Sequence, residues 1–448
     1  MKVSSSTTKI RAVFDASAKT SSGVSLNDQL LVGPTVHSTL VDVLLRFRLH
    51  RIALTSDVSR MYRAVLLPPG DRDLHRFVWR EQPNEVLCDY RMTRVTFGVA
   101  SSSYAANMAI KQNAVDHAQQ CPLAASAVHR SFFVDDCLCG ADSPTETIEL
   151  RKQLQELFAR GGFLLRKWRS SEPAVLQNVS PHLLDCQPSQ MIADSGEFAK
   201  ALGIEWSAKL DCFRLTVVKL SSSDSITKRA LVSDIAKTFN ALGWFAPTIV
   251  KIKILLQRLW EAKIGWDETV PLGIRESWEK WRQELPILTD KLLARCYFPK
   301  DAVVDSMQLH GFSDASEAAY AGVVYLRITD TSGTVHVSLV MSKTKVAPIK
   351  RITIPRLELL GAYLLANLLH YVQQVLNIPS NSVFASTDST IVLSWLVGNP
   401  RRFKPFVVNR VSTIMELVPP NCWRHVNGLD NPADCALQGM FPRELLVH

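Results

Sequence analysis

The sequence has no segment that would carry the chain into or across a membrane. Its first 30 residues are polar and rich in Ser and Thr, so they lack the apolar core of a secretory signal. The most apolar helical stretch, residues 357–372, is too short and too interrupted to span a bilayer. We therefore expect a cytoplasmic, intracellular protein without a membrane partner.

The sequence also lacks a metal-binding cysteine pattern. Its nine cysteines are scattered, and the only close pair, Cys137 and Cys139, has one residue between its members. That spacing excludes a zinc knuckle or ribbon, and free thiols in a reducing compartment are the expectation. The sequence contains no internal repeat and no low-complexity block.

The composition favours a protein of several domains that binds a polyanion. With 448 residues, 47% of them hydrophobic, the chain is long enough for about two to four domains with real cores. Lys and Arg number 51 against 42 Asp and Glu, which gives a formal charge of +9. This surplus indicates nucleic acid rather than an acidic protein as a partner.

Hydrophobic periodicity predicts a mixed α/β (α+β) fold in three parts. Short strand-like runs fill the first part, and a helix over 146–160 follows them and ends at Gly161 and Gly162. We expect this helix to pack on a sheet. Residues 221–300 have a helical pattern with five tryptophans, which we interpret as core residues. From residue 305 strands return and then alternate with helices.

An acidic pair interrupts the apolar stretch SFFVDDCLCG at residues 131–140. Asp135 and Asp136 suit either a solvated turn or a hairpin that presents two carboxylates to a hard cation such as Mg²⁺. Adjacent carboxylates raise each other's pKa unless a positive charge neutralises them. A two-metal phosphoryl-transfer site needs a further oxygen ligand from another strand. Asp57, at the end of the apolar run RIALTSD, is the candidate.

With Asp57 included, the first 220 residues resemble the palm of a reverse transcriptase of the BEL/Pao class of LTR retrotransposons. The resemblance implies that Asp57, Asp135 and Asp136 hold two Mg²⁺ ions, with Mn²⁺ as the alternative, and that the Val58 carbonyl assists. One ion would activate a primer 3′-hydroxyl, and the other would steady the leaving pyrophosphate. Tyr62, in the motif DVSRMY, would be the steric gate that excludes a ribose 2′-OH.

Two further motifs of this family would surround the incoming nucleotide. The segment KIRAVFDAS resembles a fingers strand in which Arg11, assisted by Lys9, contacts the triphosphate. The segment TFGVASSSYAAN resembles the motif that supports the template and the incoming base. In that motif Gly98 would allow a close approach of the backbone.

The sequence departs from the family pattern at Ser102-Ser103, where relatives usually carry Ser-Pro. The change frees a φ angle and restores a backbone N–H, so it either loosens the template-binding loop or marks a decaying copy. In the next motif, LLRKWRSSEP, the resemblance implies that Lys167 protonates the leaving pyrophosphate. An ordinary surface lysine is the alternative.

The C-terminal part carries a second acidic set in the order Asp, Glu, Asp, Asp. Its members lie at expected strand ends and helix starts: Asp314, Glu358, Asp388 and Asp434. Each has an ordinary explanation, such as a helix N-cap for Asp434, but the ordered set resembles a ribonuclease H domain. His425 would be that family's mobile histidine, which aids product release; a structural histidine is the alternative.

The triplet Asp194-Ser195-Gly196 matches the short motif of aspartic peptidases. It is also an ordinary turn sequence, and so short a motif often matches by chance. A peptidase is therefore only the third hypothesis.

The favoured hypothesis is RNA- or DNA-templated DNA synthesis with hydrolysis of the RNA strand of the hybrid. It assigns N-terminally truncated reverse transcriptase fingers and palm to 1–220, a helical thumb or connection to 221–300, and a ribonuclease H-like domain to 301–448. We expect a fragment of a retrotransposon polyprotein that binds an RNA template, a DNA primer or RNA–DNA hybrid, and dNTPs. Assembly into an oligomer or a virus-like particle is a further expectation. A catalytically decayed or domesticated nucleic-acid-binding remnant is the main alternative.

Overall fold

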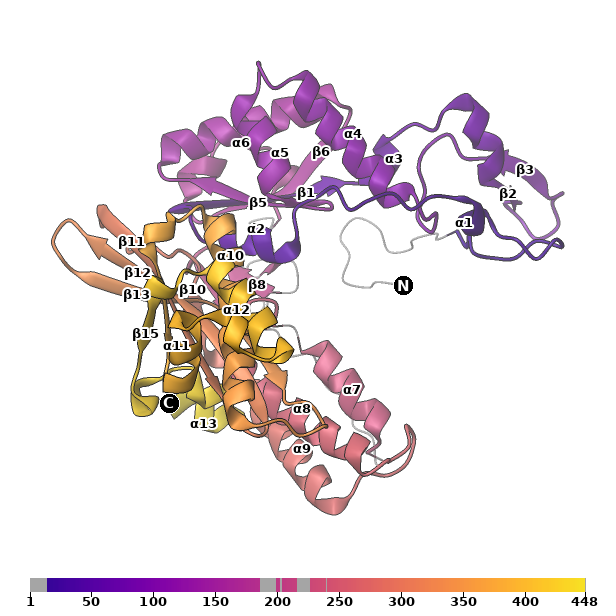
Figure 1. Ribbon diagram of the computed structural model, residues 1–448. Helices are drawn as coiled ribbons and strands as arrows, with labels where there is room; N and C mark the ends of the chain where they lie inside the picture. The colour runs from indigo at the N-terminus through magenta and orange to yellow at the C-terminus, as the bar shows by residue number, and fades with distance from the viewer. Residues whose placement is uncertain (1–13, 186–198, 202–203, 216–225, 239, 448) are drawn as a thin grey trace. The chain divides into compact units, whose positions relative to one another are not determined.

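The computed structural model describes residues 14–185, 199–201, 204–215, 226–238 and 240–447. Contacts group the chain into two units, the first from residues 1–43 and 52–196 and the second from residues 44–51 and 197–448 (Figure 1). Both units mix helices and strands, as expected. The domain boundaries near residues 220 and 300 stay predictions.

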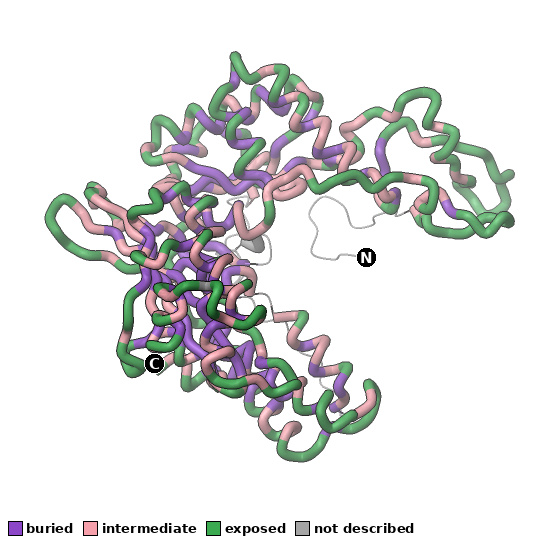
Figure 2. The backbone as a smooth tube through the Cα atoms, in the orientation of Figure 1, coloured by how far each residue is buried: buried purple, intermediate pink, exposed green. Residues whose placement is uncertain are grey.

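The first unit is built on a four-stranded antiparallel sheet, whose strands carry many of its buried residues (Figure 2). Its strands, in spatial order, are β4 (Phe132–Phe133), β5 (Asp136–Ala141), β1 (Ile52–Ser59) and β6 (Leu164–Ser170). Side chains alternate between the two faces of a strand. On β1, Leu54 and Val58 therefore face the hydrophobic core, and Asp57 faces the other side.

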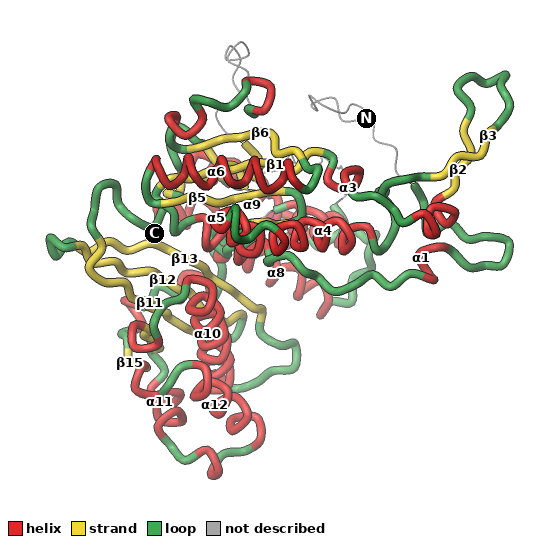
Figure 3. Tube along the Cα trace, turned by 90° about the horizontal axis from the view of Figure 1, so that it is seen from above, coloured by secondary structure: helices red, strands yellow, loops and turns green. Residues whose placement is uncertain are grey.

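Three helices supply much of the rest of this core (Figure 3): α4 (Ser102–Asp116), α5 (Pro122–Arg130) and α6 (Pro144–Arg160). The helix expected over 146–160 is confirmed as α6. The Ser143 hydroxyl caps its first turn by accepting a hydrogen bond from the Glu146 N–H at 3.3 Å. Leu150, Leu154 and Leu157 recur at helical spacing and are buried.

Shorter elements complete the first unit. They are α1 (Leu26–Gln29), the first half of α2 (Leu40–Phe47), α3 (Met61–Ala64), η1 (Pro69–His75), β2 (Arg76–Trp79), β3 (Cys88–Arg91), η2 (Pro173–Leu176) and η3 (Pro181–Leu183). Strands β2 and β3 pair with each other as a separate two-stranded sheet.

The second unit contains a five-stranded mixed sheet. Its strands, in spatial order, are β13 (Val335–Val346), β12 (Ala319–Asp330), β11 (Val304–Ala315), β14 (Val383–Thr387) and β15 (Trp423–His425). The first three form an antiparallel meander, and β14 and β15 add in parallel. The helices that follow β13 are α10 (Ile354–Leu376), α11 (Thr390–Val397), α12 (Pro405–Leu417) and α13 (Pro442–Val447), with short turns η6 (Ser380–Ser382), η7 (Pro400–Arg402), η8 (Pro420–Cys422), η9 (Gly428–Asp430) and η10 (Asp434–Ala436).

Helix α10 lies against this sheet and is longer than the stretch 357–372 that the sequence suggested. It has 23 residues, because Pro355 suits its first turn and the helix continues past residue 372 as far as the buried Val375 and Leu376. By length and hydropathy it could cross a membrane, but 67% of its most apolar window is buried inside the protein. It is therefore the core helix of this unit.

The helical region precedes the mixed sheet in the chain and contains α7 (Lys228–Lys237), α8 (Ala246–Glu261), α9 (Leu272–Glu284) and η5 (Leu285–Asp290). A small four-stranded sheet accompanies it, in the spatial order β10 (Leu292–Ala294), β9 (Cys212–Arg214), β8 (Ile204–Ser207) and β7 (Ala199–Ala201). Helix α8 packs on β12 through Val250, Ile254 and Ala319. The helical region thus shares a unit with the mixed sheet.

The interpretation of the tryptophans as core residues is right for part of the set. Trp278 and Trp281 are buried among the helices. Trp260 and Trp266 are 47% and 45% exposed, so for them the interpretation was wrong. They lie at the end of α8 and in the loop after it, where their rings meet edge to face at 5.5 Å. The Lys228 ammonium lies 3.2 Å from the centre of the Trp260 ring.

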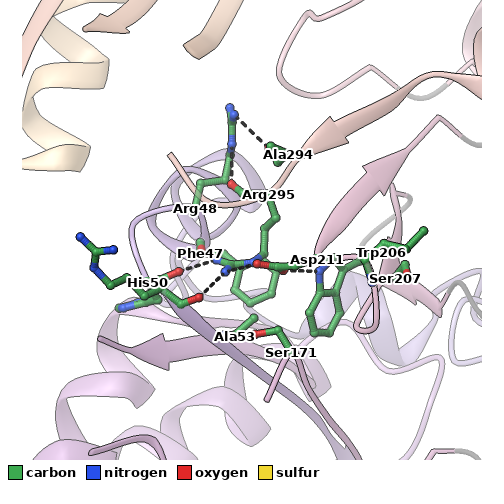
Figure 4. Close-up of polar contacts among 12 residues, drawn as sticks. Phe47, Arg48, His50, Ala53, Ser171, Trp206, Ser207, Asp211, Ala294 and Arg295 are labelled. Carbon is green, nitrogen blue, oxygen red and sulfur yellow. Dashed lines mark hydrogen bonds and ion pairs between the residues drawn. The ribbon is translucent and has the colours of Figure 1, made fainter. Parts of the chain in front are cut away.

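The buried side chain of Arg295 links residues 44–51 to the rest of the second unit through hydrogen bonds (Figure 4). Arg295 is fully buried, and two of its nitrogens donate to the Asp211 carboxylate at 2.6 and 2.7 Å. Its Nη1 donates to the carbonyls of Phe47 and His50 at 2.6 and 2.7 Å. Because the guanidinium offers five donors in one plane, it can satisfy a carboxylate and several carbonyls at once.

Candidate functional site

Two acidic clusters form, one in each unit. In the first unit, Asp57 on β1 stands directly opposite Asp136 on β5 in the antiparallel ladder. Opposed residues share a face of the sheet, so both carboxylates lie on the side away from the helical core. The Asp57 side chain is 23% exposed.

The β4–β5 hairpin carries Asp136 on β5 and Asp135 in its turn, but among the described residues the oxygens of these two and Asp57 do not all lie within 4.8 Å of one another. Its turn consists of Val134 and Asp135, since Phe133 pairs with Asp136. Val134 has φ 56°, which is unusual for a β-branched residue and costs about 1–3 kcal/mol. The Val58 N–H donates to the Asp135 carbonyl at 2.8 Å and so ties the turn to β1. The expected role of the Val58 carbonyl stays a prediction.

Burial and repulsion make this cluster receptive to a positive charge. Burial, and after it the charges of Asp135 and Asp57, raise the pKa of Asp136 to about 7, while the charge of Lys167 acts in the opposite direction. A cation bound among these carboxylates would relieve the repulsion.

Lys167 supplies one positive charge, and an irregularity of β6 puts it there. Between the pairs Thr55–Arg169 and Asp57–Arg166 the register shifts, so β6 has one residue more than β1. Lys167 lies in this bulge and has a positive φ of 55°. Its Nζ lies 2.8 Å from Asp57 Oδ2. Burial lowers the pKa of Lys167, but the hydrogen bond and charge of Asp57 outweigh it, and the net shift is upward.

The other residues expected around the nucleotide are placed as follows. Tyr62 is partly buried, and its ring meets Phe97 edge to face at 4.9 Å. Gly98 has φ 95°, and a Cβ there would lie 1.8 Å from the Phe14 carbonyl oxygen, so only glycine fits. Ser102 begins α4, and its hydroxyl donates to the Thr96 carbonyl at 2.6 Å. Lys9, Arg11 and the triplet 194–196 lie outside the described residues.

The second cluster joins three residues from separate elements of the second unit. Asp314 lies on β11 and Glu358 on α10, and Asp388 directly follows β14. Strands β11 and β14 are parallel, with Ser313 opposite Thr387, so the next residue of each reaches the same edge of the sheet. One oxygen from each of the three carboxylates lies within 4.8 Å of the other two.

A glycine that the sequence reasoning missed brings α10 close to this edge. A Cβ on Gly361, one turn after Glu358, would lie 3.0 Å from the Asp314 carbonyl oxygen. An isolated glycine inside the apolar helical pattern LELLGAYLL was the available signal.

The charges of the second cluster are poorly compensated by the protein. Burial, Asp314 and Asp388 together raise the pKa of Glu358 to about 8. Burial, then the charge of Asp388, raise the pKa of Asp314 to about 7, against a hydrogen bond from the Ala315 N–H. Within the described part of the chain, Oε2 of Glu358 and Oδ1 of Asp388 are buried without a hydrogen-bond partner. Buried carboxylate oxygens that converge and lack donors fit a hard divalent cation.

The remaining two residues of this set act on the cluster through charge. Asp434, exposed at the start of η10, raises the pKa values of Asp314 and Asp388. Burial raises the pKa of Asp388, and His425 on β15 acts in the opposite direction. The role of His425 in product release stays a prediction.

This sheet order, long helix and acidic cluster define a ribonuclease H-like domain. Residues 227–389, which include Asp314, Glu358 and Asp388, match the family model of the Pao retrotransposon-like RNaseH-like domain. This region therefore carries that domain, and the expected resemblance to Pao retrotransposons is confirmed.

Solved structures extend the fold likeness over most of the chain. The foamy viral protease-reverse transcriptase dRH in complex with ds DNA matches with a TM-score of 0.59 and 14% identity, over 91% of this chain and 62% of that chain. The foamy viral protease-reverse transcriptase in complex with RNA/DNA hybrid matches with a TM-score of 0.54 and 13% identity, over 88% of this chain and 46% of that chain. The expected fold class is confirmed. No curated protein matches the chain in sequence.

Proposed function

We propose that this chain hydrolyses the RNA strand of RNA–DNA hybrids at the second cluster and extends a DNA primer at the first. The observation that carries the proposal is the group formed by Asp314, Glu358 and Asp388, whose oxygens converge within 4.8 Å. Such a group has little use in stabilising the fold, since burying unpaired carboxylates is unfavourable. It suits the binding of a cation.

In the hydrolytic reaction, Asp314, Glu358 and Asp388 would hold Mg²⁺, with Mn²⁺ as the alternative. The metal supplies an activated water nucleophile and neutralises charge on the scissile phosphate. The three carboxylates come from a strand end, a buried helix and a strand–helix junction, and regular elements of this kind would hold them in place for the cation. Recognition of the hybrid would rest on the RNA 2′-OH and on duplex shape.

In the polymerase reaction, Asp57, Asp135 and Asp136 would hold the metal. Lys167, which pairs with Asp57 at 2.8 Å, would give a proton to the leaving pyrophosphate. Tyr62, braced edge to face by Phe97, would limit the space beside the sugar of the incoming dNTP. Among the structural neighbours, one was solved with ds DNA and another with an RNA/DNA hybrid, which supports nucleic acid partners for this chain.

Cleavage of a labelled RNA–DNA hybrid in Mg²⁺ tests the proposal, with Asp388→Asn as the variant. The substitution keeps the size of the side chain but removes the charge that holds the cation, so we expect loss of cleavage with hybrid binding retained. Asp290→Asn, at an exposed carboxylate of the same unit at the end of η5, is the matched control. A wild-type chain that binds the hybrid but neither cuts RNA nor extends a primer would instead support the decayed, nucleic-acid-binding alternative.

A further inference from the structure

The buried side-chain amide of Asn431 hydrogen-bonds two backbone groups, each next to an acidic residue of the second unit. Asn431 is 4% exposed and lies between η9 and η10. Its Nδ2 donates to the Ser313 carbonyl at 3.1 Å. Its Oδ1 accepts a hydrogen bond from the Ala433 N–H at 3.2 Å. Both polar atoms of this side chain are thereby satisfied, as a buried amide requires.

The two partners of Asn431 immediately precede acidic residues. Ser313 comes before Asp314 on β11, and Ala433 comes before Asp434 in η10. The Asp434 N–H in turn donates to the Asn431 carbonyl at 3.1 Å. One residue thus fixes the backbone at Asp314 relative to the backbone at Asp434.

The same loop also passes close to a third carboxylate. A Cβ on Gly428 would lie 3.3 Å from Asp388 Oδ2, so the loop backbone runs beside that oxygen. The Asn427 side chain shapes the start of the loop by accepting from the Leu429 N–H at 3.2 Å. The loop from 427 to 434 is therefore built against the cluster, and Asn431 is its inner anchor.

We propose that Asn431 is a positioning residue that sets the spacing between Asp314 and Asp434 and so the affinity of the cluster for its cation. The inference rests on the proposed function of this site. The amide group offers a donor and an acceptor in one plane, so the Asn431 side chain satisfies both partners at once. Removing such an outer partner of a metal-binding residue typically costs about 10–100-fold in metal affinity or activity.

The test compares Asn431→Leu, which keeps the branched shape and removes both hydrogen bonds, with the control Asn409→Leu, at an exposed asparagine on α12. Mg²⁺ binding is measured by calorimetry on the full chain without nucleic acid, and kcat and KM are measured on a labelled RNA–DNA hybrid. For Asn431→Leu we expect about 10-fold weaker Mg²⁺ binding and a kcat lowered by about 10-fold. KM for the hybrid should stay near the wild-type value. Asn409→Leu should leave Mg²⁺ binding and kcat within about two-fold of wild type.

Asn431→Ala extends the test if the leucine variant does not fold, because the smaller side chain leaves room for water to replace the lost hydrogen bonds. Melting temperatures are recorded for every variant. Unchanged Mg²⁺ binding in a folded Asn431 variant overturns the inference, and so does equal weakening in the Asn409 control. If the wild type binds Mg²⁺ but cuts no RNA, weaker binding in the Asn431 variant still supports positioning, and only the proposed function fails.

Discussion

The two acidic clusters solve the same electrostatic problem in different ways. In the first unit, Lys167 contacts Asp57 at 2.8 Å and lowers the pKa of the neighbouring Asp136. In the second unit, burial and both neighbouring aspartates all raise the pKa of Glu358. The first cluster therefore carries part of its counter-charge in its own fold. The second depends more fully on a cation from solution, and we expect it to respond more strongly to removal of metal.

Among substitutions that distinguish the two clusters, we expect the largest loss of activity at Asp135. Asp135→Asn should lower primer extension on a poly(rA) template by about 1,000-fold, because a bound metal contributes several kcal/mol to phosphoryl transfer. Binding of the hybrid should be nearly unchanged, as should cleavage of its RNA strand. Normal extension by this variant would mean that the hairpin is only a turn.

A smaller loss is expected when the built-in counter-charge is removed. Lys167→Met should reduce primer extension by about 100-fold, in the range of a general acid, and leave RNA cleavage unaffected. Lys152→Met, at an exposed lysine on α6, serves as the control. If the two variants had equal activity in single-turnover extension, Lys167 would be an ordinary surface lysine without a catalytic role.

Sugar selection should change by a smaller factor. Tyr62→Ala removes the ring that packs on Phe97, and incorporation of ribonucleotides relative to deoxynucleotides should rise by about 10-fold or more, the size of about 1.4 kcal/mol of steric exclusion. Tyr90→Ala, an exposed tyrosine on β3, is the control. Unchanged discrimination would place the gate at another residue.

The smallest expected effect is a pH dependence of stability without metal. Glu358 and Asp314 have pKa values raised to about 8 and about 7, above those of an unfolded chain. The folded protein therefore binds more protons than the unfolded one between about pH 4.5 and 8, and stability must fall as pH rises through that range. In EDTA the melting temperature should drop by about 5 °C between pH 5 and 8.5, and Mg²⁺ should restore it.

The contribution of each cluster to this pH dependence can be measured by recording the melting temperatures of one variant from each cluster. Glu358→Gln should flatten the pH dependence more than Asp136→Asn, because Lys167 already offsets part of the charge around Asp136. The opposite order would contradict the idea that the second cluster is the less compensated one.

Some features of both clusters follow from sequence pattern, and others depend on geometry that a pattern does not contain. Asp57 and the Asp135–Asp136 pair could be found because acidic residues end apolar runs, and α6 could be found from its periodicity and its terminal glycines. The extra residue at Lys167 in β6 could not be predicted, since a register shift depends on how two distant strands pair. Asn431 was missed because a polar loop residue is usually exposed, and only the tertiary fold buries this one.

The most direct test of two separate active sites measures both activities on two variants of the full chain. We predict that Asp388→Asn extends a DNA primer on RNA but leaves the RNA strand of the hybrid whole. Asp57→Asn should cut the RNA of a preformed hybrid but make no DNA. If either single substitution abolished both activities in a protein that stayed folded, the assignment of one reaction to each cluster would be contradicted.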